Sequence, residues 1–372
     1  MARLALARAR GLGLMAAWRL IATFGSAAAA MDLARRAPEA LSLPAAVAES
    51  LRTAAWQEAE REVAVARSEG LQWHFPKLDR AASELNEIAG PPLVLAIAGK
   101  RELLDGGGPR VAIVGARTAT PYGAQQSRRF SAALSENGVT VVSGFARGID
   151  REAHRAALDV QGKTLGVLGS GLLEPYPVDD RELLGRMRER GCLLSEFPLR
   201  AGARREHFPR RNRVISGLSR GVLVVEAGRA SGSLLTARWA LDQDRDLWVL
   251  PGRVDSPMSA GCHDLLKQGA AIVDSPQDVL SDLGLVVVPR SASGRRVQGS
   301  AGGVLELGEP SVKRLLLDRA RGGATLEELS DACAGHEEAL FGALLQLEMA
   351  GEISRGPGGY YYAVEGPVGR AP

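Results

Sequence analysis

Apolar runs alternate with amphipathic stretches between about Val94 and Leu285, and this alternation is the clearest pattern in the chain. The runs predict buried strands at Val111–Val114, Thr140–Ser143, Leu165–Leu168, Leu193–Leu194, Val222–Val225, Leu247–Leu250 and Ala271–Val273. The stretches between them predict helices, notably at Gly123–Glu136, Ile149–Leu158, Asp179–Arg190 and Ser233–Asp242. Strands that alternate with helices are typical of a parallel sheet covered on both faces. We therefore expect an α/β fold, with a Rossmann-like, doubly wound and mostly parallel sheet, over residues 76–290.

Residues 1–75 have a helical pattern instead. The sequence predicts helices at Ala2–Arg10, Leu14–Phe24, Ala27–Arg36 and Ala45–Ser68, with turns at Gly11/Gly13 and Gly25. The Gly11-Leu12-Gly13 turn between short helices is similar to a helix-hairpin-helix, whose exposed amides can touch a phosphate. Helices of this kind also often only pack. We expect a helical domain of helix-hairpin-helix or SAM-like type and leave its contact with phosphate open.

The C-terminal part has a different composition. Residues 291–303 are rich in serine, glycine and arginine and are expected to form a flexible linker. Residues 304–372 predict helices at Pro310–Ala320, Leu326–Cys333 and Glu337–Ala350, followed by strands at Glu352–Ser354 and Tyr360–Ala363. Helices followed by a strand pair indicate a small winged-helix domain.

Composition limits the class of protein. A chain of 372 residues is too long for one ordinary domain, and a hydrophobic content of 45% supports packed cores. Cys192, Cys262 and Cys333 are far apart, which argues against a disulfide framework and structural zinc and fits reduced thiols in the cytoplasm. The apolar stretch Gly11–Met31 carries Arg19 in its middle, where a signal peptide does not tolerate a charge. We expect a cytoplasmic protein with no membrane partner.

The most informative charged stretch runs from Arg200 to Arg213, where six arginines surround one phenylalanine, Phe208. An arginine can bind phosphate oxygens through two N–H groups, and a phenylalanine offers a face on which a base stacks. The alternative for any basic run is a solvated charged loop. The glycine-rich turns elsewhere in the chain favour a groove that follows a polyanion.

Four turns that combine glycine with hydroxyl or arginine side chains follow predicted strands. They are Gly115-Ala116-Arg117-Thr118, Ser143–Asp150 with Gly144 and Arg147, Gly169-Ser170-Gly171, and Glu226–Ser233 with Ser231 and Gly232. Glycine lets the backbone approach a ligand closely, and the amino end of a helix favours an anion. Ligands of doubly wound sheets bind beyond the carboxyl ends of the strands. Four such turns at this edge exceed what packing alone requires.

Two polar residues that follow the second turn are expected to have structural roles. Asp150 is expected to cap the helix that carries His154. His154 has no acid–nucleophile partner that the sequence identifies, so it is expected to pack or to form a hydrogen bond. The sequence therefore predicts no catalytic residue.

Two nucleotide-binding motifs are incomplete. Gly162-Lys163-Thr164 is not the end of a P-loop, because Ala157 stands where a glycine is required and the tripeptide precedes a strand. Gly169 and Gly171 are not a dinucleotide fingerprint, because Glu174 takes the place of its third glycine. We expect no ATP hydrolysis, no NAD, no metal and no other cofactor.

Together these motifs resemble the DNA-processing protein A family, also called DprA or Smf. The resemblance covers nearly the whole chain and rests on Gly115–Thr118, Ser143–His154, Ser195–Pro198, His207–Gly217, Glu226–Ala237, Pro251-Gly252 and Gly261–Ala270. His263 departs from the family, which usually has asparagine there, and is left out of the site.

The resemblance implies a cytoplasmic, non-enzymatic protein that binds single-stranded DNA and protects incoming DNA. It also implies a homodimer, formed through the Rossmann-like domain, that loads the RecA recombinase during natural transformation. Matching motifs carry over Arg117, Phe208, Arg211, Asn212 and Arg213 as strand-binding residues. With the turns included, the expected nucleic-acid-binding set is Gly115, Arg117, Thr118, Ser143, Gly144, Arg147, Gly169, Phe208, Arg211, Asn212, Arg213, Ser231, Gly232 and Ser233.

An enzyme is the alternative. The sheet and its Gly/Ser-rich turn also resemble the LOG-like phosphoribohydrolases, which cleave a nucleoside monophosphate at its glycosidic bond. Those enzymes place a carboxylate directly after the Gly-Thr turn, whereas Gly232-Ser233 leads here into Leu234–Ala237 and the first acid is Asp242. A developing oxocarbenium ion would then lack a carboxylate to stabilise it. The sequence therefore favours the single-strand binder.

Overall fold

The computed structural model describes residues 1–37, 41, 43–79 and 83–285, together with short pieces of the C-terminal part. Those pieces are 324–325, 329, 344, 347–348, 350, 352–355 and 360–363. The chain divides into two compact units, Met1–Pro289 and Arg290–Pro372, each of which is considered by itself. The domain boundaries expected at residues 75 and 303 fall inside these units and stay predictions.

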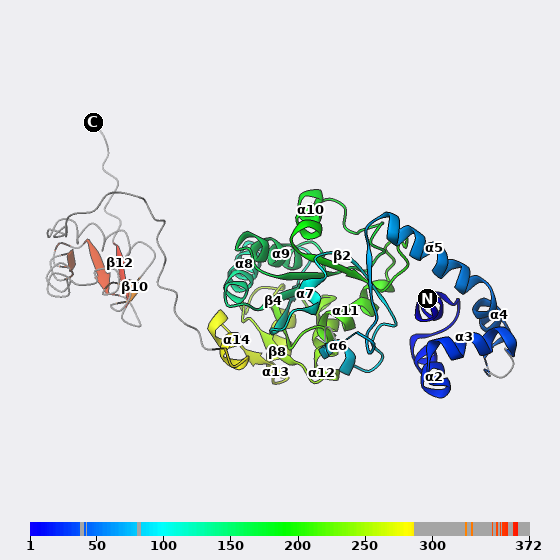
Figure 1. Cartoon of the computed structure of the whole chain (residues 1–372). Helices are drawn as coiled ribbons and strands as arrows, with labels where there is room; N and C mark the ends of the chain where they lie inside the picture. The colour runs from blue at the N-terminus through cyan, green and yellow to red at the C-terminus, as the bar shows by residue number, and fades with distance from the viewer. Residues whose placement is uncertain are drawn as a thin grey trace, which may run out of the picture. The chain divides into compact units, whose positions relative to one another are not determined.

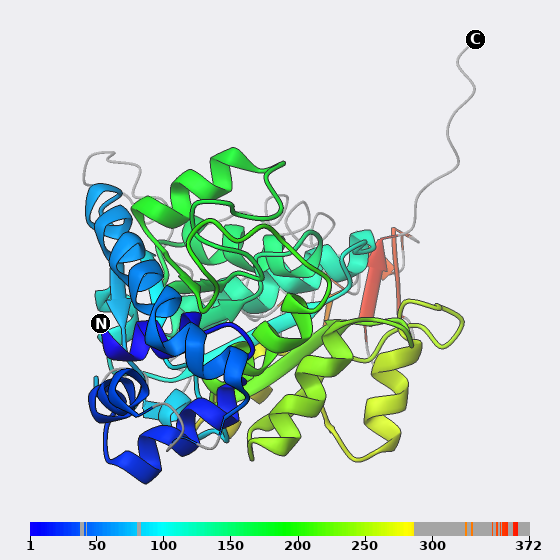
Figure 2. The ribbon, with the colours of Figure 1, turned by 90° about the vertical axis from the view of Figure 1, so that its right-hand side faces the viewer.

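The N-terminal layer consists of helices whose alanine and leucine side chains pack into one core. These helices are the blue group in Figure 2. They are α1 (Ala2–Arg8), α2 (Leu14–Phe24), α3 (Ala27–Arg36), α4 (Ala45–Arg52) and α5 (Ala54–Ser68). Gly25 ends α2 in the left-handed conformation, and the Ser26 hydroxyl then caps α3 by accepting from Ala29 N at 3.1 Å. The predicted bounds of α2 and α3 are confirmed.

The single helix predicted over Ala45–Ser68 is wrong, because Thr53 interrupts it. The backbone of Thr53 has φ −129° and ψ −72°, which is not helical. Its hydroxyl donates to Glu49 O at 3.1 Å and so satisfies a carbonyl at the end of α4. The chain turns there and begins again as α5.

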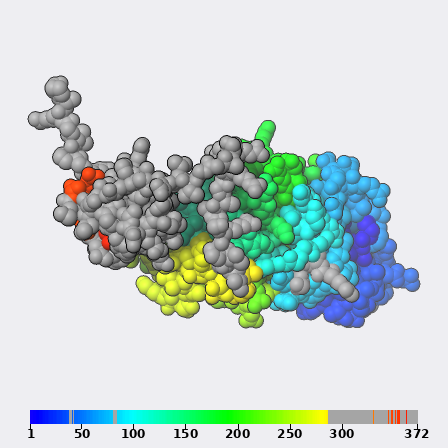
Figure 3. Space-filling view, turned by 60° about the vertical axis from the view of Figure 1, so that its left-hand side comes forward, coloured from blue at the N-terminus to red at the C-terminus, as the bar shows by residue number. Residues whose placement is uncertain are grey.

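A buried ion pair joins the N-terminal layer to the rest of its unit. Arg8 Nε lies 2.6 Å from Glu62 Oε2, and both side chains are almost fully buried. Glu62 Oε1 also accepts from Leu199 N at 2.7 Å, in the segment after strand β6 (Cys192–Ser195). The space-filling view shows these blue helices lying directly against the cyan part of the chain (Figure 3). The layer therefore packs on the sheet-containing part through both apolar and charged contacts.

The main sheet has nine strands within the described residues, in the order β1-β2-β6-β5-β4-β3-β7-β8-β9. Besides β6, the strands are β1 (Gln72–His74), β2 (Leu95–Gly99), β3 (Arg110–Gly115), β4 (Thr140–Ser143), β5 (Thr164–Val167), β7 (Gly221–Glu226), β8 (Asp246–Val249) and β9 (Ala271–Ile272). The pairs from β6 to β9 are parallel, whereas β1–β2 and β2–β6 are antiparallel. The predicted Rossmann-like, mostly parallel fold is confirmed, although the sequence analysis assigned neither β1 nor β2.

Helices cover both faces of this sheet (Figure 1). One face carries α8 (Pro121–Glu136), α9 (Ile149–Asp159), α10 (Arg181–Glu189) and α14 (Pro276–Asp282). The other carries α6 (Ser83–Glu87), α7 (Glu102–Asp105), α11 (His207–Gly217), α12 (Ser233–Asp242) and α13 (Ala260–Lys267). Successive β3 residues serve the two cores in turn, since Val111 and Ile113 pack in one cluster and Ala112 and Val114 in the other. Burial on both faces explains why these strands are continuous apolar runs.

The topology places a crevice at the carboxyl end of β3. The chain runs from β3 through β4 and β5 to β6 on one side, then crosses to β7 on the other side and continues to β9. Such a reversal of strand order is the position where doubly wound sheets bind ligands. The crossing segment contains α11, so this helix passes beside the crevice.

The second unit contains a small antiparallel sheet in the order β10-β12-β11. Its strands are β10 (Ala324–Thr325), β11 (Ile353–Arg355) and β12 (Tyr360–Ala363). The expected pairing of the last two strands is confirmed, with Ser354 opposite Tyr362. The helices predicted before them lie largely outside the described residues, so the winged-helix domain stays a prediction.

Among the residues that the structure describes, no single helix is long and apolar enough to cross a membrane. The helices α2 and α3 meet the length and composition criteria only as a pair, and a bend of 91° separates them. Both helices contribute buried side chains to the core of the N-terminal layer, among them Leu20 and Met31. Their apolar composition is accounted for by this core.

Candidate functional site

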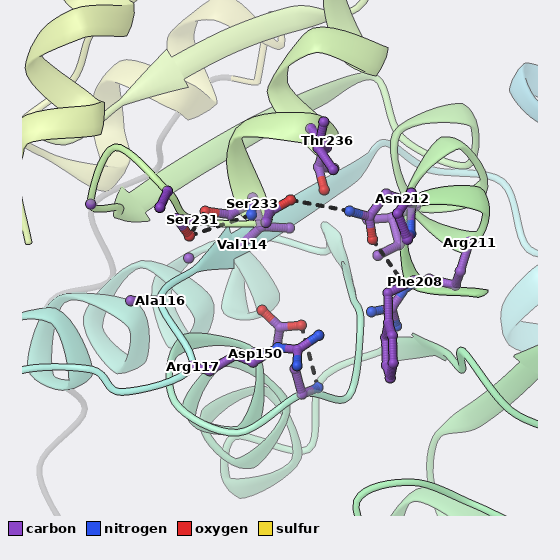
Figure 4. A pocket seen from close by; sticks show the side chains of 18 of the residues that line it. Val114, Ala116, Arg117, Asp150, Phe208, Arg211, Asn212, Ser231, Ser233 and Thr236 are labelled. Carbon is purple, nitrogen blue, oxygen red and sulfur yellow. Dashed lines mark hydrogen bonds between the residues drawn. The ribbon is translucent and has the colours of Figure 1, made fainter. Parts of the chain in front are cut away.

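A pocket of about 580 Å³ lies in the crevice at the carboxyl ends of β3 and β7. Its walls are the loop after β3, the turn before α12 and the first half of α11, as Figure 4 shows. Segments more than 100 residues apart in sequence, Gly115–Thr118 and Ser231–Ser233, therefore face one space. The fold brings three of the four turns that the sequence analysis singled out to this space, whereas the turn Gly169-Ser170-Gly171 does not line it.

Arg211 fixes α11 across the ends of the strands. Its guanidinium donates to the carbonyl oxygens of Gly144, after β4, and of Val167, at the end of β5. The side chain is only 4% exposed, and burial lowers the pKa of Arg211 to about 10. It remains charged at neutral pH, and its buried charge faces the carboxylate of Asp150.

Asp150 organises the loop between β4 and α9. Its Oδ2 accepts from Gly144 N at 3.0 Å and from Ala146 N at 3.3 Å. The pKa of Asp150 is raised above its usual value, because burial outweighs the charge of Arg211 and these hydrogen bonds, which act to lower it. The expectation that its side chain caps α9 is wrong, because both hydrogen bonds go back to the preceding loop.

The loop after β3 is fixed by Glu226, the last residue of β7. Its carboxylate accepts from Thr120 N at 2.9 Å and from Thr120 Oγ1 at 2.7 Å. The Thr120 hydroxyl in turn caps α8 by accepting from Gly123 N, and Pro121 begins the helix. The carboxylate also lies near the positive end of α8. This support fixes the loop while Arg117, at its tip, stays exposed.

Phe208 stands at the mouth of the pocket between two arginines. The guanidinium carbon of Arg117 lies 4.7 Å from the centre of its ring, and that of Arg211 lies 6.0 Å away. The Phe208 ring is half-buried, and it packs so close to Gly169 that a Cβ on this glycine would lie 2.9 Å from the ring. Gly169 is therefore a residue that makes room for Phe208.

The turn before α12 supplies hydroxyl groups and the amino end of a helix. The Ser231 and Ser233 hydroxyl oxygens lie 2.7 Å apart, and Asn212 Nδ2 donates to Gly232 O at 3.2 Å. Thr236, one turn further along α12, is 1% exposed and turns its hydroxyl toward the pocket (Figure 4). Hydroxyl groups at the amino end of a helix are suited to an anion.

Two cations at the pocket have no polar partner among the described residues. Neither Arg117 nor Arg205 forms a hydrogen bond or an ion pair with any residue that the structure describes, and both line the pocket. Unpaired guanidinium groups, an aromatic face and a helix amino end together suit phosphate groups and a flat ring. Across the described ranges, no group of three or more His, Cys, Asp or Glu side chains is arranged to hold a metal ion.

The family model for the DNA recombination-mediator protein A matches residues 72–284, which include every wall of the pocket. The chain belongs to this family. The resemblance drawn from the sequence motifs is thereby confirmed.

Relatives of the recombination-mediator family agree along most of the chain. Protein Smf of Escherichia coli strain K12 is 41% identical over 254 residues, which cover 68% of this chain and 67% of that protein. DprA of Streptococcus pneumoniae, in its X-ray structure, has a TM-score of 0.66 at 33% identity and covers 74% of this chain and 95% of that one. DprA of Helicobacter pylori has a TM-score of 0.52 at 30% identity, covering 57% and 95%. Its structure is described as giving insights into that protein's unique single-stranded DNA binding mode.

The structure divides the predicted binding residues into two groups. Those that line the pocket are Gly115, Arg117, Thr118, Phe208, Arg211, Asn212, Ser231, Gly232 and Ser233. Those that do not line it are Ser143, Gly144, Arg147, Gly169 and Arg213. The first group stays our proposed contact surface, with Arg211 also serving as a buried anchor.

The second group makes contacts inside the fold, and its direct contact with DNA stays a prediction. The Ser143 hydroxyl donates to Ile113 O at 2.6 Å, and Gly144 N is bound by Asp150. Arg147 is exposed but pairs with Asp179 at 3.0 Å. These groups are occupied within the fold and hold the loops that shape the pocket.

Arg213 is buried and paired inside the fold. It is 5% exposed, donates to Gly90 O at 2.8 Å and forms a buried ion pair with Glu196. In a helix, two residues correspond to about 200° of rotation, so Arg213 points away from the face that carries Arg211. The basic run thus contains both surface and structural arginines.

Sequence reasoning missed Arg205 and Thr236 as pocket residues. Arg205 stood inside the basic run, but nothing local distinguishes it from Arg204 or Arg210. Thr236 follows Ser233 by three residues in a predicted helix, and this spacing places both side chains on one helix face. The spacing was the available signal for Thr236.

We expect Arg213→Ala to lower the free energy of unfolding by about 3 kcal/mol, because Glu196 and Gly90 O lose a buried partner. Urea denaturation of the two purified proteins measures the change. The matched control is Arg205→Ala, which removes the same charge from an exposed side chain and should alter the unfolding free energy by less than about 0.5 kcal/mol. Equal stability of the two variants would show that Arg213 is not a structural link.

Proposed function

We propose that this protein binds single-stranded DNA in the pocket between β3 and β7. The observation that carries the proposal is the exposed, unpaired Arg117 stacked at 4.7 Å on Phe208, at the mouth of a pocket that ends at the amino end of α12. The arginines and hydroxyl groups would hold backbone phosphates, and Phe208 would stack a base. The Helicobacter pylori relative, described as binding single-stranded DNA, supports this reading.

The preference for single strands follows from the position of Phe208. A base stacks on a ring only when it has left its own neighbours, and a duplex keeps its bases inside. Phosphates and ring faces are common to all nucleotides, so binding should depend little on sequence. We therefore propose that the protein binds single strands with little dependence on their base sequence.

We further propose that the protein is a recombination mediator. The protein would protect incoming DNA and load the RecA recombinase onto it in the cytoplasm during natural transformation. The family description, a DNA recombination mediator, supports this role. A homodimer through the Rossmann-like domain is also proposed, and it fits the edge strand β9, whose Ile272 side chain is 64% exposed.

The phosphoribohydrolase alternative is not favoured. The carboxylates nearest the pocket already have partners, since Asp150 accepts from two backbone amides and Glu226 from Thr120. These hydrogen bonds direct both buried carboxylates to the loops, which disfavours a role in stabilising a developing oxocarbenium ion or in activating a water. We therefore propose a protein without catalytic activity, and the assay for the alternative is release of free adenine from AMP.

The proposed function predicts tighter binding of a fluorescent oligothymidylate than of a duplex of equal length. The measurement is an anisotropy titration of both at the same salt concentration. Affinity for the single strand should fall as salt rises, by roughly 0.7 in the log–log slope for each phosphate contact. Equal affinity for the two DNA forms would contradict base stacking on Phe208. An affinity that does not change with salt would contradict phosphate binding by the arginines.

Arg117→Ala should weaken single-strand binding about ten- to a hundredfold while leaving the unfolding midpoint unchanged. The guanidinium is exposed and forms no hydrogen bond or ion pair with the described residues, although it lies over the Phe208 ring, so its loss costs mainly a ligand contact. The salt slope should also become shallower by about 0.7. The control is Arg220→Ala, an equally charged change at the opposite end of β7. Similar losses in both variants would mean that only net charge matters.

A further inference from the structure

A second exposed aromatic ring stands beside Phe208. Tyr176 belongs to the loop between β5 and α10, and its ring centre lies 6.0 Å from that of Phe208, with the planes at 64°. The Tyr176 side chain is 45% exposed. In an edge-to-face pair, the ring that contributes its edge keeps both faces free, whereas a stacked pair would cover one face of each ring. Tyr176 therefore extends the aromatic surface outward from the pocket.

The loop that carries Tyr176 is fixed at its first end by backbone hydrogen bonds. Gly171 N donates to Ala201 O at 2.8 Å, and Leu173 N donates to Leu199 O at 2.9 Å. These bonds tie the loop to the segment that leads into α11, the helix of Phe208. The two rings are thus held by connected pieces of backbone.

Ion pairs fix the other end of the loop. Asp179 bonds Arg147 at 3.0 Å and Arg151 at 2.9 Å. Asp180 caps α10 through Leu183 N at 3.1 Å and pairs with Arg155 at 2.8 Å. Arg147, which the sequence assigned to DNA contact, has this anchoring role in the structure.

The short arch between these anchors is stiffened by its sequence. Tyr176 lies between Pro175 and Pro177. Each proline fixes its own φ, and Pro177 also restricts the backbone of the residue before it. The tyrosine is held outward with little conformational freedom to lose on binding, which favours a preorganised contact.

The exposure of Tyr176 is not explained by internal packing. Tyr122, a tyrosine of similar exposure, uses its hydroxyl to donate to Pro251 O at 3.0 Å. Tyr176 forms no hydrogen bond with the described residues, and its ring contact is with Phe208. The chain has only five tyrosines and seven phenylalanines, so two partly exposed rings in contact are not a result of abundance.

We infer that Tyr176 forms a second stacking position, for the unpaired base next to the one on Phe208. The inference rests on the proposed function. Arg117, Phe208 and Tyr176 then make a row of flat groups that crosses the carboxyl edge of the sheet from the loop after β3 to the loop after β5. A strand whose phosphates enter the pocket would lay successive bases along this row.

The charges around Tyr176 indicate that this position works through its ring. Asp179 is neutralised by Arg147 and Arg151, and the exposed Glu174 carboxylate lies two residues before Tyr176. An unpaired carboxylate disfavours a phosphate at this point. Tyr176 should therefore contribute to affinity without contributing to the salt dependence, in contrast to Arg117.

The test compares the full-length protein with Tyr176→Ala, Tyr176→Phe and Val178→Ala. The last is a control on the same loop, since Val178 is 61% exposed. Each protein is titrated with an oligothymidylate and with an oligonucleotide of equal length made of abasic residues. Tyr176→Ala should weaken oligothymidylate binding roughly five- to twentyfold with an unchanged salt slope. Tyr176→Phe and Val178→Ala should bind as the wild type does.

The abasic oligonucleotide separates stacking from a structural effect. Tyr176→Ala should bind it as well as the wild type does, because it has phosphates and no bases. Equal affinity of Tyr176→Ala and wild type for oligothymidylate would overturn the inference, as would an equal loss on both oligonucleotides. A wild-type protein that fails to bind oligothymidylate would overturn the proposed function itself, and a normal wild type with a silent Tyr176→Ala would overturn the second position alone.

Discussion

The buried guanidinium of Arg211 is the interaction on which the arrangement of the site depends. It donates to carbonyl oxygens at the ends of the neighbouring strands β4 and β5 and faces the carboxylate of Asp150. A buried cation is stable only with such partners, so α11 has to lie across the carboxyl edge of the sheet. Phe208 precedes Arg211 by three residues and shares its helix face, which places the ring at the mouth of the pocket.

The opposite face of α11 is tied to the N-terminal layer. Arg213 pairs with Glu196, and the segment that carries Glu196 continues to Leu199, whose amide is bound by Glu62. Glu62 is paired in turn with Arg8. Buried charges therefore connect the first helix of the chain to the helix of the site. The arginine-rich composition serves two purposes, because buried arginines build the scaffold and exposed ones face the ligand.

The sequence predicts the features that depend on residues close together in the chain. Continuous apolar runs such as Val111–Val114 identified the parallel strands, and the glycine turns after them identified the edge that forms the pocket. It did not predict α11 or the burial of Arg211 and Arg213, because their partners lie 67 residues and 17 residues away in sequence. It did not assign β2 either, since antiparallel pairing with β6 depends on a distant strand. The role of a side chain whose partners are distant in sequence can be assigned only when the fold is known.

The central claim is that a single strand lies in the crevice between β3 and β7, against α11. Photo-crosslinking with an oligonucleotide that carries 4-thiothymidine, followed by mass spectrometry of the digested protein, locates the contact directly. The account predicts crosslinks in the segment around Arg117 and in the segment of Arg205 and Phe208, with competition by unlabelled single strands. Crosslinks confined to the N-terminal helices, or to residues after Pro289, would contradict it.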